Sequence, residues 1–270
     1  MKQGRMRAPV GVVGTVLALV VAGSCTPQVI ASTSEGAGQH TSASPEPSQS
    51  VKPTPSPDSL RAPAPAPGSV KPPPDKDGLP PVVADIDTDD RVVFFTIDDG
   101  YTKDPKVLEI LEERDIPVTP FLTRAAIAND RGYFSRVEEI TGQDVQNHTL
   151  THPQLPSRNR SGQKTEICGT DEAFQEWFGQ RPWMLRPPYG EWNRDTQLAA
   201  QQCGIDYLVM WSVSLPTSQL RYQIGNKLRP GDIILTHWTP SLGPALPAVL
   251  DDIKKQGFKI AALQDYLPAR

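Results

Sequence analysis

Two of the four histidines in the 270-residue chain lie four positions apart, in the polar segment QNHTLTHP (residues 146–153). On a helical turn, His148 and His152 would share one face, so their imidazole rings would converge on one point. This is the geometry of a two-histidine metal site, although surface histidines also reach this spacing by chance. The spacing therefore indicates a metal site only if a further ligand lies nearby.

Two aspartates end the apolar segment RVVFFTIDDG (residues 91–100), which is predicted to form a buried strand. Neighbouring strand residues point to opposite faces, so Asp98 and Asp99 enter one site only if the chain leaves strand geometry. Gly100 permits that turn. One carboxylate could then complete a metal-ligand set and the other could act as a base. The alternative is an ordinary Asp-Asp-Gly cap or turn.

Two further segments carry groups suited to acyl chemistry. In RPPYG (residues 186–190), two prolines fix the backbone, and Arg186 could hold a carboxylate in a two-pronged grip. The peptide N–H of Tyr189 could face a developing oxyanion. In IILTHW (residues 233–238), His237 follows an apolar strand. The alternatives are a rigid loop for the first segment and a structural histidine for the second.

The predicted strands place these groups at the same end of the predicted sheet. The hydrophobic pattern predicts strands over 91–100, 116–123, 144–149, 182–188, 205–213, 231–238 and 258–263, and helices over 106–114, 133–142, 165–179, 194–204 and 244–257. This alternation indicates parallel strands with crossover helices, in a closed barrel or an open sheet. The candidate catalytic and metal-ligating residues, together with Trp211, lie at the C-terminal ends of the predicted strands, where a barrel carries its active site.

Taken together, four motifs resemble those of the polysaccharide deacetylases, the NodB-homology group also called family 4 carbohydrate esterases. They are TIDDG, HTLTH, RPPYG and LTH, at residues 96–100, 148–152, 186–190 and 235–237. The resemblance covers essentially all of residues 90–265. It implies an α/β fold, a distorted barrel with about seven parallel strands, which agrees with the alternation of strands and helices.

The resemblance also implies a metal site and a set of roles. Asp99, His148 and His152 would bind a divalent ion, usually zinc, with cobalt or manganese as alternatives. Three protein ligands leave positions open for water and substrate. By the same resemblance, Asp98 would be the general base and Arg186 would orient it. The backbone N–H of Tyr189 would stabilise the oxyanion, and His237 would protonate the departing amine. Trp211 and Leu235 would lie around the acetyl methyl group.

One motif departs from the family pattern. The family places an aspartate shortly after the strand tryptophan, where it pairs with the last histidine and raises its pKa. Here the stretch reads MWSVSLPTSQL (residues 210–220), with Ser214 and Thr217 where acids are expected, and no Asp or Glu occurs from Tyr207 to Gly231. We therefore expect His237 to be less basic than usual or to use another partner.

The function implied is an exported, metal-dependent enzyme that hydrolyses N-acetyl groups of a polysaccharide such as peptidoglycan or chitin-like oligomers. Two alternatives stay open. One is a weak or inactive homologue that binds cell-wall glycan, and the other is an O-acetyl esterase on the same scaffold. We expect a monomer. The net charge of −4, without a basic block in the folded part, gives no support for a nucleic-acid partner.

The N-terminus predicts export. Basic residues at positions 2, 5 and 7 precede an apolar run from about Ala8 to Ala22, as in a secretory signal peptide over residues 1–24. The following VAGSC (residues 21–25) resembles a lipobox, so Cys25 is predicted to be lipidated. The alternative is an ordinary cleaved signal. The expected location is outside the cytoplasm, membrane-anchored or secreted, and associated with the cell wall.

Residues 25–82 are predicted to form a disordered linker before a domain over residues 83–270. Thirteen of the 29 prolines lie between Pro45 and Pro81, with few large apolar residues, so this segment cannot offset its ordering entropy by burial. Cys168 and Cys203 lie on predicted neighbouring helices of an exported domain, and we expect them to form a disulfide.

Overall fold

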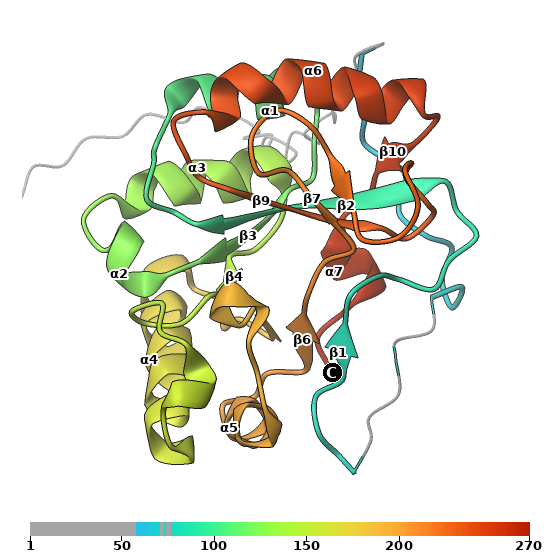
Figure 1. Ribbon diagram of the computed structural model, residues 1–270. Helices are drawn as coiled ribbons and strands as arrows, with labels where there is room; N and C mark the ends of the chain where they lie inside the picture. Colours follow the sequence, from blue (N-terminus) through green and yellow to red (C-terminus); the bar gives the residue numbers. More distant parts are fainter. Residues whose placement is uncertain (1–57, 71–72, 74–76) are drawn as a thin grey trace, which may run out of the picture. The chain divides into compact units, whose positions relative to one another are not determined.

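A curled sheet organises the part of the chain that the computed structural model describes, residues 58–70, 73 and 77–270 (Figure 1). The longest strand, β2, pairs in parallel with β3 on one side and with β9 on the other. The strands are β1 (Val82–Val83), β2 (Val92–Asp99), β3 (Thr119–Leu122), β4 (Gln146–Asn147), β5 (Met184–Leu185), β6 (Tyr207–Val209), β7 (Val213–Ser214), β8 (Arg221–Tyr222), β9 (Ile233–His237) and β10 (Lys259–Ile260).

The strand order is β1-β6-β5-β4-β3-β2-β9-β7-β8, with β10 added to β2, and only the β7–β8 pair is antiparallel. This mostly parallel, half-barrel sheet confirms the predicted distorted barrel. It contains more strands than the seven expected. The predicted strand over 205–213 divides into β6, which pairs with β5, and β7, which pairs with β9. Where they separate, the carbonyls of Val209 and Met210 accept hydrogen bonds from the Arg186 side chain. The short strands β1 and β8 were not predicted.

Most of the helices join parallel strands as crossovers, whereas α7 follows the last strand. The helices are α1 (Pro105–Glu113), α2 (Arg124–Ile127), α3 (Arg131–Thr141), α4 (Arg160–Phe178), α5 (Arg194–Gln202), α6 (Leu242–Lys255) and α7 (Leu263–Tyr266), with 3-10 turns η1 (Leu155–Ser157) and η2 (Pro188–Gly190). In Figure 1, α6 lies alongside α1 and α4 lies alongside α5, as their contacts also show. Helix α1 begins where Asp104 accepts a hydrogen bond from the Lys106 N–H.

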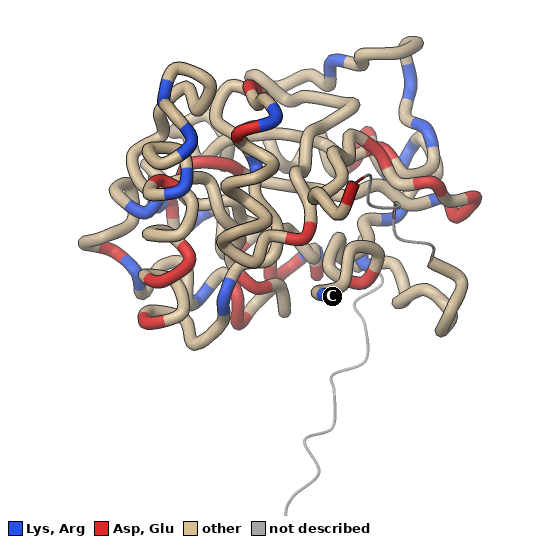
Figure 2. The backbone as a smooth tube through the Cα atoms, turned by 90° about the horizontal axis from the view of Figure 1, so that it is seen from below, with Lys and Arg blue, Asp and Glu red and all other residues tan. Residues whose placement is uncertain are grey.

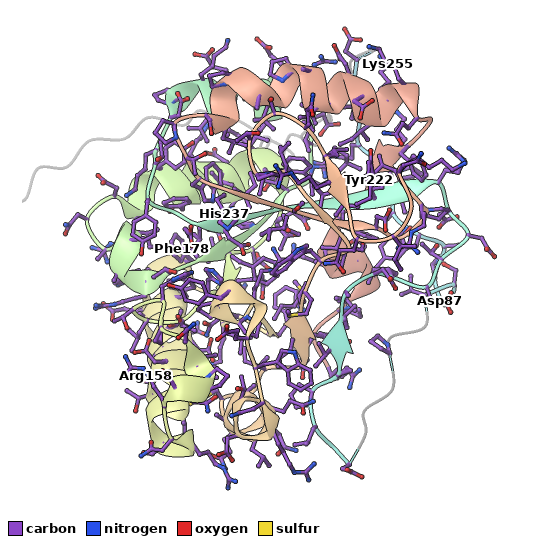
Figure 3. All side chains as sticks on the ribbon, in the orientation of Figure 1. Asp87, Arg158, Phe178, Tyr222, His237 and Lys255 are labelled. Carbon is purple, nitrogen blue, oxygen red and sulfur yellow. A yellow bond between two sulfur atoms is a disulfide. The ribbon has the colours of Figure 1, made fainter. Side chains whose placement is uncertain are left out.

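The central strand is buried on both faces, as expected for a strand covered by helices. Val93, Phe95 and Ile97 pack in the cluster that includes α1 and α6, whereas Phe94 faces a second cluster with Phe121. Side chains occupy both sides of the sheet in Figure 3, where the labelled His237 lies at the end of β9. Packing of β2 therefore fixes the strand end at which the polar residues emerge.

The folded part begins earlier than predicted. Leu60 is 1% exposed, its N–H donates to the Arg114 carbonyl, and Arg61 forms an ion pair with Asp115 and a bridge to Ile260. The predicted linker over residues 25–82 is thus too long, because its average composition hides the few apolar residues that pack. The signal segment, Cys25 and the linker up to residue 57 lie outside the described residues. Among the described residues, no helix is long and apolar enough to span a membrane.

Acidic and basic residues are distributed over the same surfaces. Figure 2 shows Lys and Arg interspersed with Asp and Glu along the described chain, and several of them pair, as Arg114 does with Asp251 and Arg160 with Asp195. Exposed pairs of this kind contribute little to stability. The charges therefore do not by themselves mark a binding surface.

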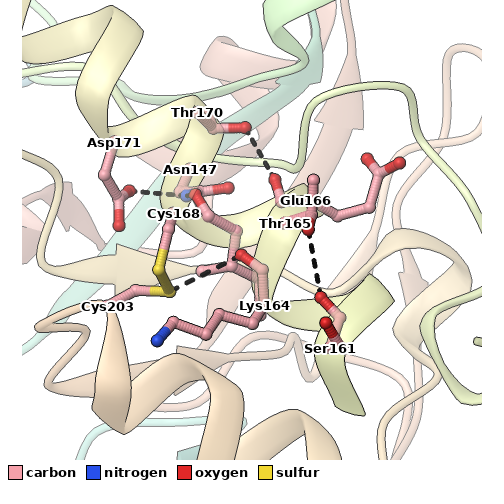
Figure 4. The surroundings of a disulfide bond; sticks show 10 residues. Asn147, Ser161, Lys164, Thr165, Glu166, Cys168, Thr170, Asp171 and Cys203 are labelled. Atoms are coloured by element: carbon pink, nitrogen blue, oxygen red, sulfur yellow. Dashed lines mark hydrogen bonds between the residues drawn. A yellow bond between two sulfur atoms is a disulfide. The ribbon is translucent and has the colours of Figure 1, made fainter. Parts of the chain in front are cut away.

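A disulfide joins Cys168 in α4 to Cys203, which follows α5, with 5.0 Å between the Cα atoms (Figure 4). Helix α4 begins five residues before the predicted start, because the Asn159 side chain caps it by accepting from the Gly162 N–H. The structure thus contains the cysteine pair named from the sequence. The disulfide links the two crossover helices that flank β4 and β5.

We expect removal of this disulfide to destabilise the domain. With a sequence separation of 35 between the cysteines, the chain-entropy argument predicts that the Cys168→Ala/Cys203→Ala variant loses roughly 3–4 kcal/mol of unfolding free energy. Urea unfolding of the variant and of the native protein, each with and without reductant, measures the loss. Reductant should affect only the native protein. Equal unfolding midpoints without reductant would contradict the prediction.

Candidate active site

A pocket of about 260 Å³ opens at the C-terminal ends of the strands. It gathers the predicted site residues from five separate segments, and Arg186 lies buried beside it. The pocket is lined by Asp98, Asp99, His148, His152, Pro187, Tyr189, Gly190, Trp211, Leu235 and His237.

Two aspartates reach this pocket because β2 ends in a left-handed turn. Asp99 has a φ of 79° and Gly100 a φ of 98°. Glycine is needed at position 100 for its left-handed backbone and also for space, because a Cβ atom there would lie 2.5 Å from the Ile127 side chain. The backbone therefore leaves strand geometry at Asp99, one residue before the glycine from which the turn was predicted. As a result, Asp98 and Asp99 both line the pocket.

Arg186 holds three strands together beneath the pocket. Its guanidinium donates to Asp98 Oδ1 at 2.7 Å, to Thr96 Oγ1 at 2.6 Å, and to the carbonyls of Val209, the last residue of β6, and Met210. It also lies 4.3 Å above the centre of the Phe121 ring. Burial lowers the pKa of Arg186, and the Asp98 carboxylate opposes that effect. The expected two-pronged grip is wrong, because the other guanidinium nitrogens bind backbone carbonyls.

The two histidines converge without a helix, contrary to the helical turn expected from their spacing. After β4 the chain is irregular, and both Thr149 (φ 70°) and His152 (φ 60°) are left-handed. The Asn147 side chain accepts from the Thr149 N–H at 2.7 Å, and Thr149 Oγ1 accepts from the His152 N–H at 3.1 Å. Side-chain hydrogen bonds therefore replace the backbone ladder that a helix would supply.

Helix α4 supports this turn through residues that sequence reasoning missed. Both oxygens of Glu166 accept hydrogen bonds from Thr151, at 2.8 and 2.9 Å. Asp171 Oδ1 accepts from the Asn147 side chain at 2.6 Å, which Figure 4 shows next to the disulfide. These acids lie 15 and 24 residues from their partners, so no local sequence signal connects them.

Three potential metal ligands point at one another. Asp99 Oδ1 lies 3.4 Å from His148 Nε2 and 3.3 Å from His152 Nε2, and it is buried without a hydrogen-bond partner. Ligand atoms of a tetrahedral zinc ion, each about 2.0–2.1 Å from the metal, lie about 3.3 Å apart. The orphaned oxygen and the observed spacings therefore fit a divalent ion.

The protonation states also suit a metal site. His148 Nδ1 lies 2.6 Å from the Arg186 carbonyl, which can only accept, so Nδ1 carries the proton and Nε2 offers its lone pair. Burial and the neighbouring His148 lower the pKa of His152, which favours its neutral form. Burial raises the pKa of Asp99, but the neighbouring histidines, His148 first, outweigh this effect, so the pKa of Asp99 is lowered.

A further part of the pocket wall comes from η2 and the chain after β6. Tyr189 has a φ of 61°, and its ring centre lies 4.8 Å from that of His152. A Cβ atom on Gly190 would lie 2.9 Å from the Trp211 ring, so only glycine allows this approach. Trp211 and Leu235 supply the apolar part of the pocket lining.

His237 completes the pocket from β9. It pairs in register with Asp98 across the β2–β9 ladder, and the next N–H, that of Trp238, donates to the Asp98 carbonyl. Ser214 lies opposite Leu235 in β7. Among the described residues, no carboxylate lies within ion-pair distance of His237, in contrast to His148 and His152. The missing acid of the fourth motif is therefore not replaced by a direct contact.

The sequence profile of the polysaccharide deacetylases matches residues 85–208. The chain is 32% identical over 155 residues to a chitooligosaccharide deacetylase of Sinorhizobium fredii, covering 54% of this chain and 71% of that protein. The chain belongs to the polysaccharide deacetylase family. A protein of Streptomyces coelicolor without an assigned function is 39% identical over 195 residues, covering 70% of this chain and 78% of that protein.

Solved structures agree on the fold of this polysaccharide deacetylase. A family 4 carbohydrate esterase pseudoenzyme of Bacillus anthracis superposes with a TM-score of 0.61 at 23% identity, over 70% of this chain and 69% of the other. At that identity the likeness concerns the fold alone. The family is one of metal-dependent hydrolases, and the Asp99–His148–His152 cluster is a candidate metal site within it.

We expect His152→Ala to lose most of its bound metal, because only two ligands would remain. Elemental analysis after incubation with zinc and gel filtration measures the occupancy. His237→Ala is a matched control, since it removes an imidazole from the same pocket without touching the ligand cluster, and it should keep its metal. Full occupancy in His152→Ala would show that the ligand assignment is wrong.

Asp171, which binds Asn147 beneath the histidine turn, should make the stability of the protein depend on pH. Burial raises the pKa of Asp171 to about 8, although the Asn147 hydrogen bond opposes this. Between its ordinary pKa near 4 and about 8, the folded state holds a proton that the unfolded state has lost. Native stability should therefore fall as the pH rises through this window, and Asp171→Asn should lack that part of the slope. Urea unfolding of both proteins from pH 4 to 8 tests this, and parallel curves would contradict it.

Proposed function

We propose that the chain is an exported, metal-dependent deacetylase that hydrolyses N-acetyl groups of a cell-wall polysaccharide such as peptidoglycan or chitin-like oligomers. One observation carries the proposal. A single pocket combines the ligand cluster with a buried Asp98–Arg186 pair and with His237. The predicted signal segment and Cys25 support export, by secretion or with a lipid anchor.

In this proposal, Asp98 takes the proton of the attacking water. Arg186 binds its Oδ1 atom, and Oδ2 lies 3.8 Å from His148 Nε2, so the carboxylate is fixed beside the ligand cluster. When bound, a divalent ion, zinc first and cobalt or manganese as alternatives, polarises the acetamide carbonyl and lowers the pKa of a coordinated water.

The other pocket residues act on the acetyl group and the amine. The Tyr189 peptide N–H stabilises the oxyanion that develops on the carbonyl oxygen. Trp211 and Leu235 enclose the methyl group. Water adds its oxygen to the carbonyl carbon, the carbon–nitrogen bond breaks, and His237 gives a proton to the departing amine. The products are acetate and a free amino sugar.

Acetate release tests this function. The native protein, loaded with zinc, cobalt or manganese, is incubated with peptidoglycan, chitin oligomers or acetylated xylan. Release from xylan alone would favour an O-acetyl esterase. Asp98→Asn should keep the metal and lose about 10²–10⁴-fold in turnover, as expected for a general base.

The control for Asp98→Asn is Asp232→Asn. Asp232 is equally buried and also contacts an arginine, Arg229, but it lies at the other end of β9 and outside the pocket. If the two variants lose the same activity, the loss comes from disturbing a buried aspartate and not from removing the base.

A second candidate, glycan binding with little turnover, is favoured by the unpaired His237. Among the described residues, no carboxylate pairs with this histidine, the expected proton donor to the departing amine. We expect Ser214→Asp to move the alkaline limb of the pH–rate profile upward, because a carboxylate raises the pKa of His237 and keeps it protonated at higher pH. An unchanged limb in a folded, metal-loaded variant would contradict this expectation. An inactive native protein that still binds glycan would establish the second candidate.

A further inference from the structure

Glu166 is a buried carboxylate to which the proposed mechanism gives no role. It is 7% exposed and lies in the first half of α4, two residues before Cys168 (Figure 4). A carboxylate is rarely buried unless its oxygens are bound. Here Oε1 accepts from the Thr151 hydroxyl at 2.8 Å, and Oε2 accepts from the Thr151 N–H at 2.9 Å. The whole carboxylate therefore binds the residue directly before His152.

The same part of α4 also binds the backbone of the histidine turn. The Glu166 carbonyl accepts from the Leu150 N–H at 3.0 Å, and the Ile167 carbonyl accepts from the Asn147 side chain at 3.0 Å. Two consecutive N–H groups of the turn, those of Leu150 and Thr151, therefore donate to a single residue of the helix.

A glycine inside α4 shows how closely the helix approaches the turn. Gly169 lies three residues after Glu166, at an interior helical position where glycine is less favourable than alanine. A Cβ atom on Gly169 would lie 2.7 Å from Leu150 Cδ1, so even alanine would displace the Leu150 side chain. The turn is therefore packed against the helix as well as hydrogen-bonded to it.

His152 needs this support because its backbone is strained. Its φ of 60° lies in a region that residues other than glycine rarely adopt. Inside the turn, the His152 N–H donates to Thr149 Oγ1, and outside the turn the preceding residue is bound to Glu166. A metal-ligating histidine binds well only when such surrounding contacts fix its orientation.

We propose that Glu166 is a positioning residue of the metal site, which raises metal affinity by holding Thr151 and thereby fixing the approach of His152 to the ion. This inference rests on the proposed function, in which the Asp99–His148–His152 cluster binds a divalent ion. Glu166 acts through its two hydrogen bonds and not as a ligand, because both of its oxygens already bind Thr151.

Zinc affinity at one fixed pH tests this, measured on metal-free protein by competition with a chromophoric chelator. Groups that orient a metal-ligating histidine typically contribute 10–100-fold to metal affinity. Because Glu166 acts through the residue next to the ligand, we expect Glu166→Ala to weaken zinc binding about ten-fold. Glu166→Gln should restore most of the affinity, since its amide can accept from the Thr151 N–H and donate to the Thr151 hydroxyl.

A second variant tests the same contact from its other side. Thr151→Val removes only the hydroxyl group of an exposed side chain, so it should weaken zinc binding less than Glu166→Ala does. Added to Glu166→Ala, it should cause no further loss, because the two residues act through one contact.

Glu138→Ala is the matched control. Glu138 lies in α3, and its Oε1 accepts from the Val145 N–H at 3.0 Å, directly before β4 and so at the opposite end of that strand from the histidine turn. The variant removes the same kind of bond, and it should lower the unfolding midpoint in urea without changing zinc affinity. The visible absorption of cobalt-loaded protein, which reports the arrangement of the ligands, should change in Glu166→Ala and not in Glu138→Ala.

Native-like zinc affinity in folded Glu166→Ala would overturn the inference, and so would an equal loss in Glu138→Ala. An equal loss in Glu166→Gln would assign the effect to the charge and overturn positioning as well. If Glu166→Ala does not fold, native-like affinity in Thr151→Val decides against the inference. Failure of the proposed function is a separate result, because it appears as no acetate release by a native protein whose zinc affinity still depends on Glu166.

Discussion

The buried charge of Arg186 is the constraint on which the rest of the site depends. A guanidinium without solvent must have its charge and its N–H groups satisfied inside the protein. Here the partners come from β2, from the end of β6 and from the Phe121 ring on β3. The same residue's carbonyl orients His148. One residue therefore positions both Asp98, the proposed base, and His148, a proposed metal ligand.

Backbone strain gathers around this residue. Six non-glycine residues in the described part have positive φ values: Asp77, Asp99, Asp115, Thr149, His152 and Tyr189. Four of these six lie in the pocket or in its histidine turn. Such conformations persist only when surrounding contacts over-determine them. Helix α4 provides those contacts through Glu166 and Asp171, and the disulfide ties α4 to α5. The stability of this region and the orientation of the candidate metal ligands are therefore linked.

The sequence allowed the main groups of the site to be predicted because they lie in short contiguous motifs. Asp98, Asp99 and Gly100 indicate the end of a strand that carries two carboxylates. The alternation of strands and helices places that end beside the other motifs. The shape of the histidine turn could not be predicted, since distant hydrogen bonds to α4 impose it. The start of the domain was misjudged for a related reason. Leu60 packs because of partners more than fifty residues away, and composition cannot register them.

The place where the chain enters the domain has a geometric consequence. The N-terminal described residues contact Arg114 and Asp115, just before β3, and Ile260, in the strand that pairs with the start of β2. These contacts lie at the N-terminal ends of the strands, whereas the pocket opens at their C-terminal ends. The chain therefore enters the described domain at the end of the sheet opposite the pocket, and its first described residues take no part in the pocket lining.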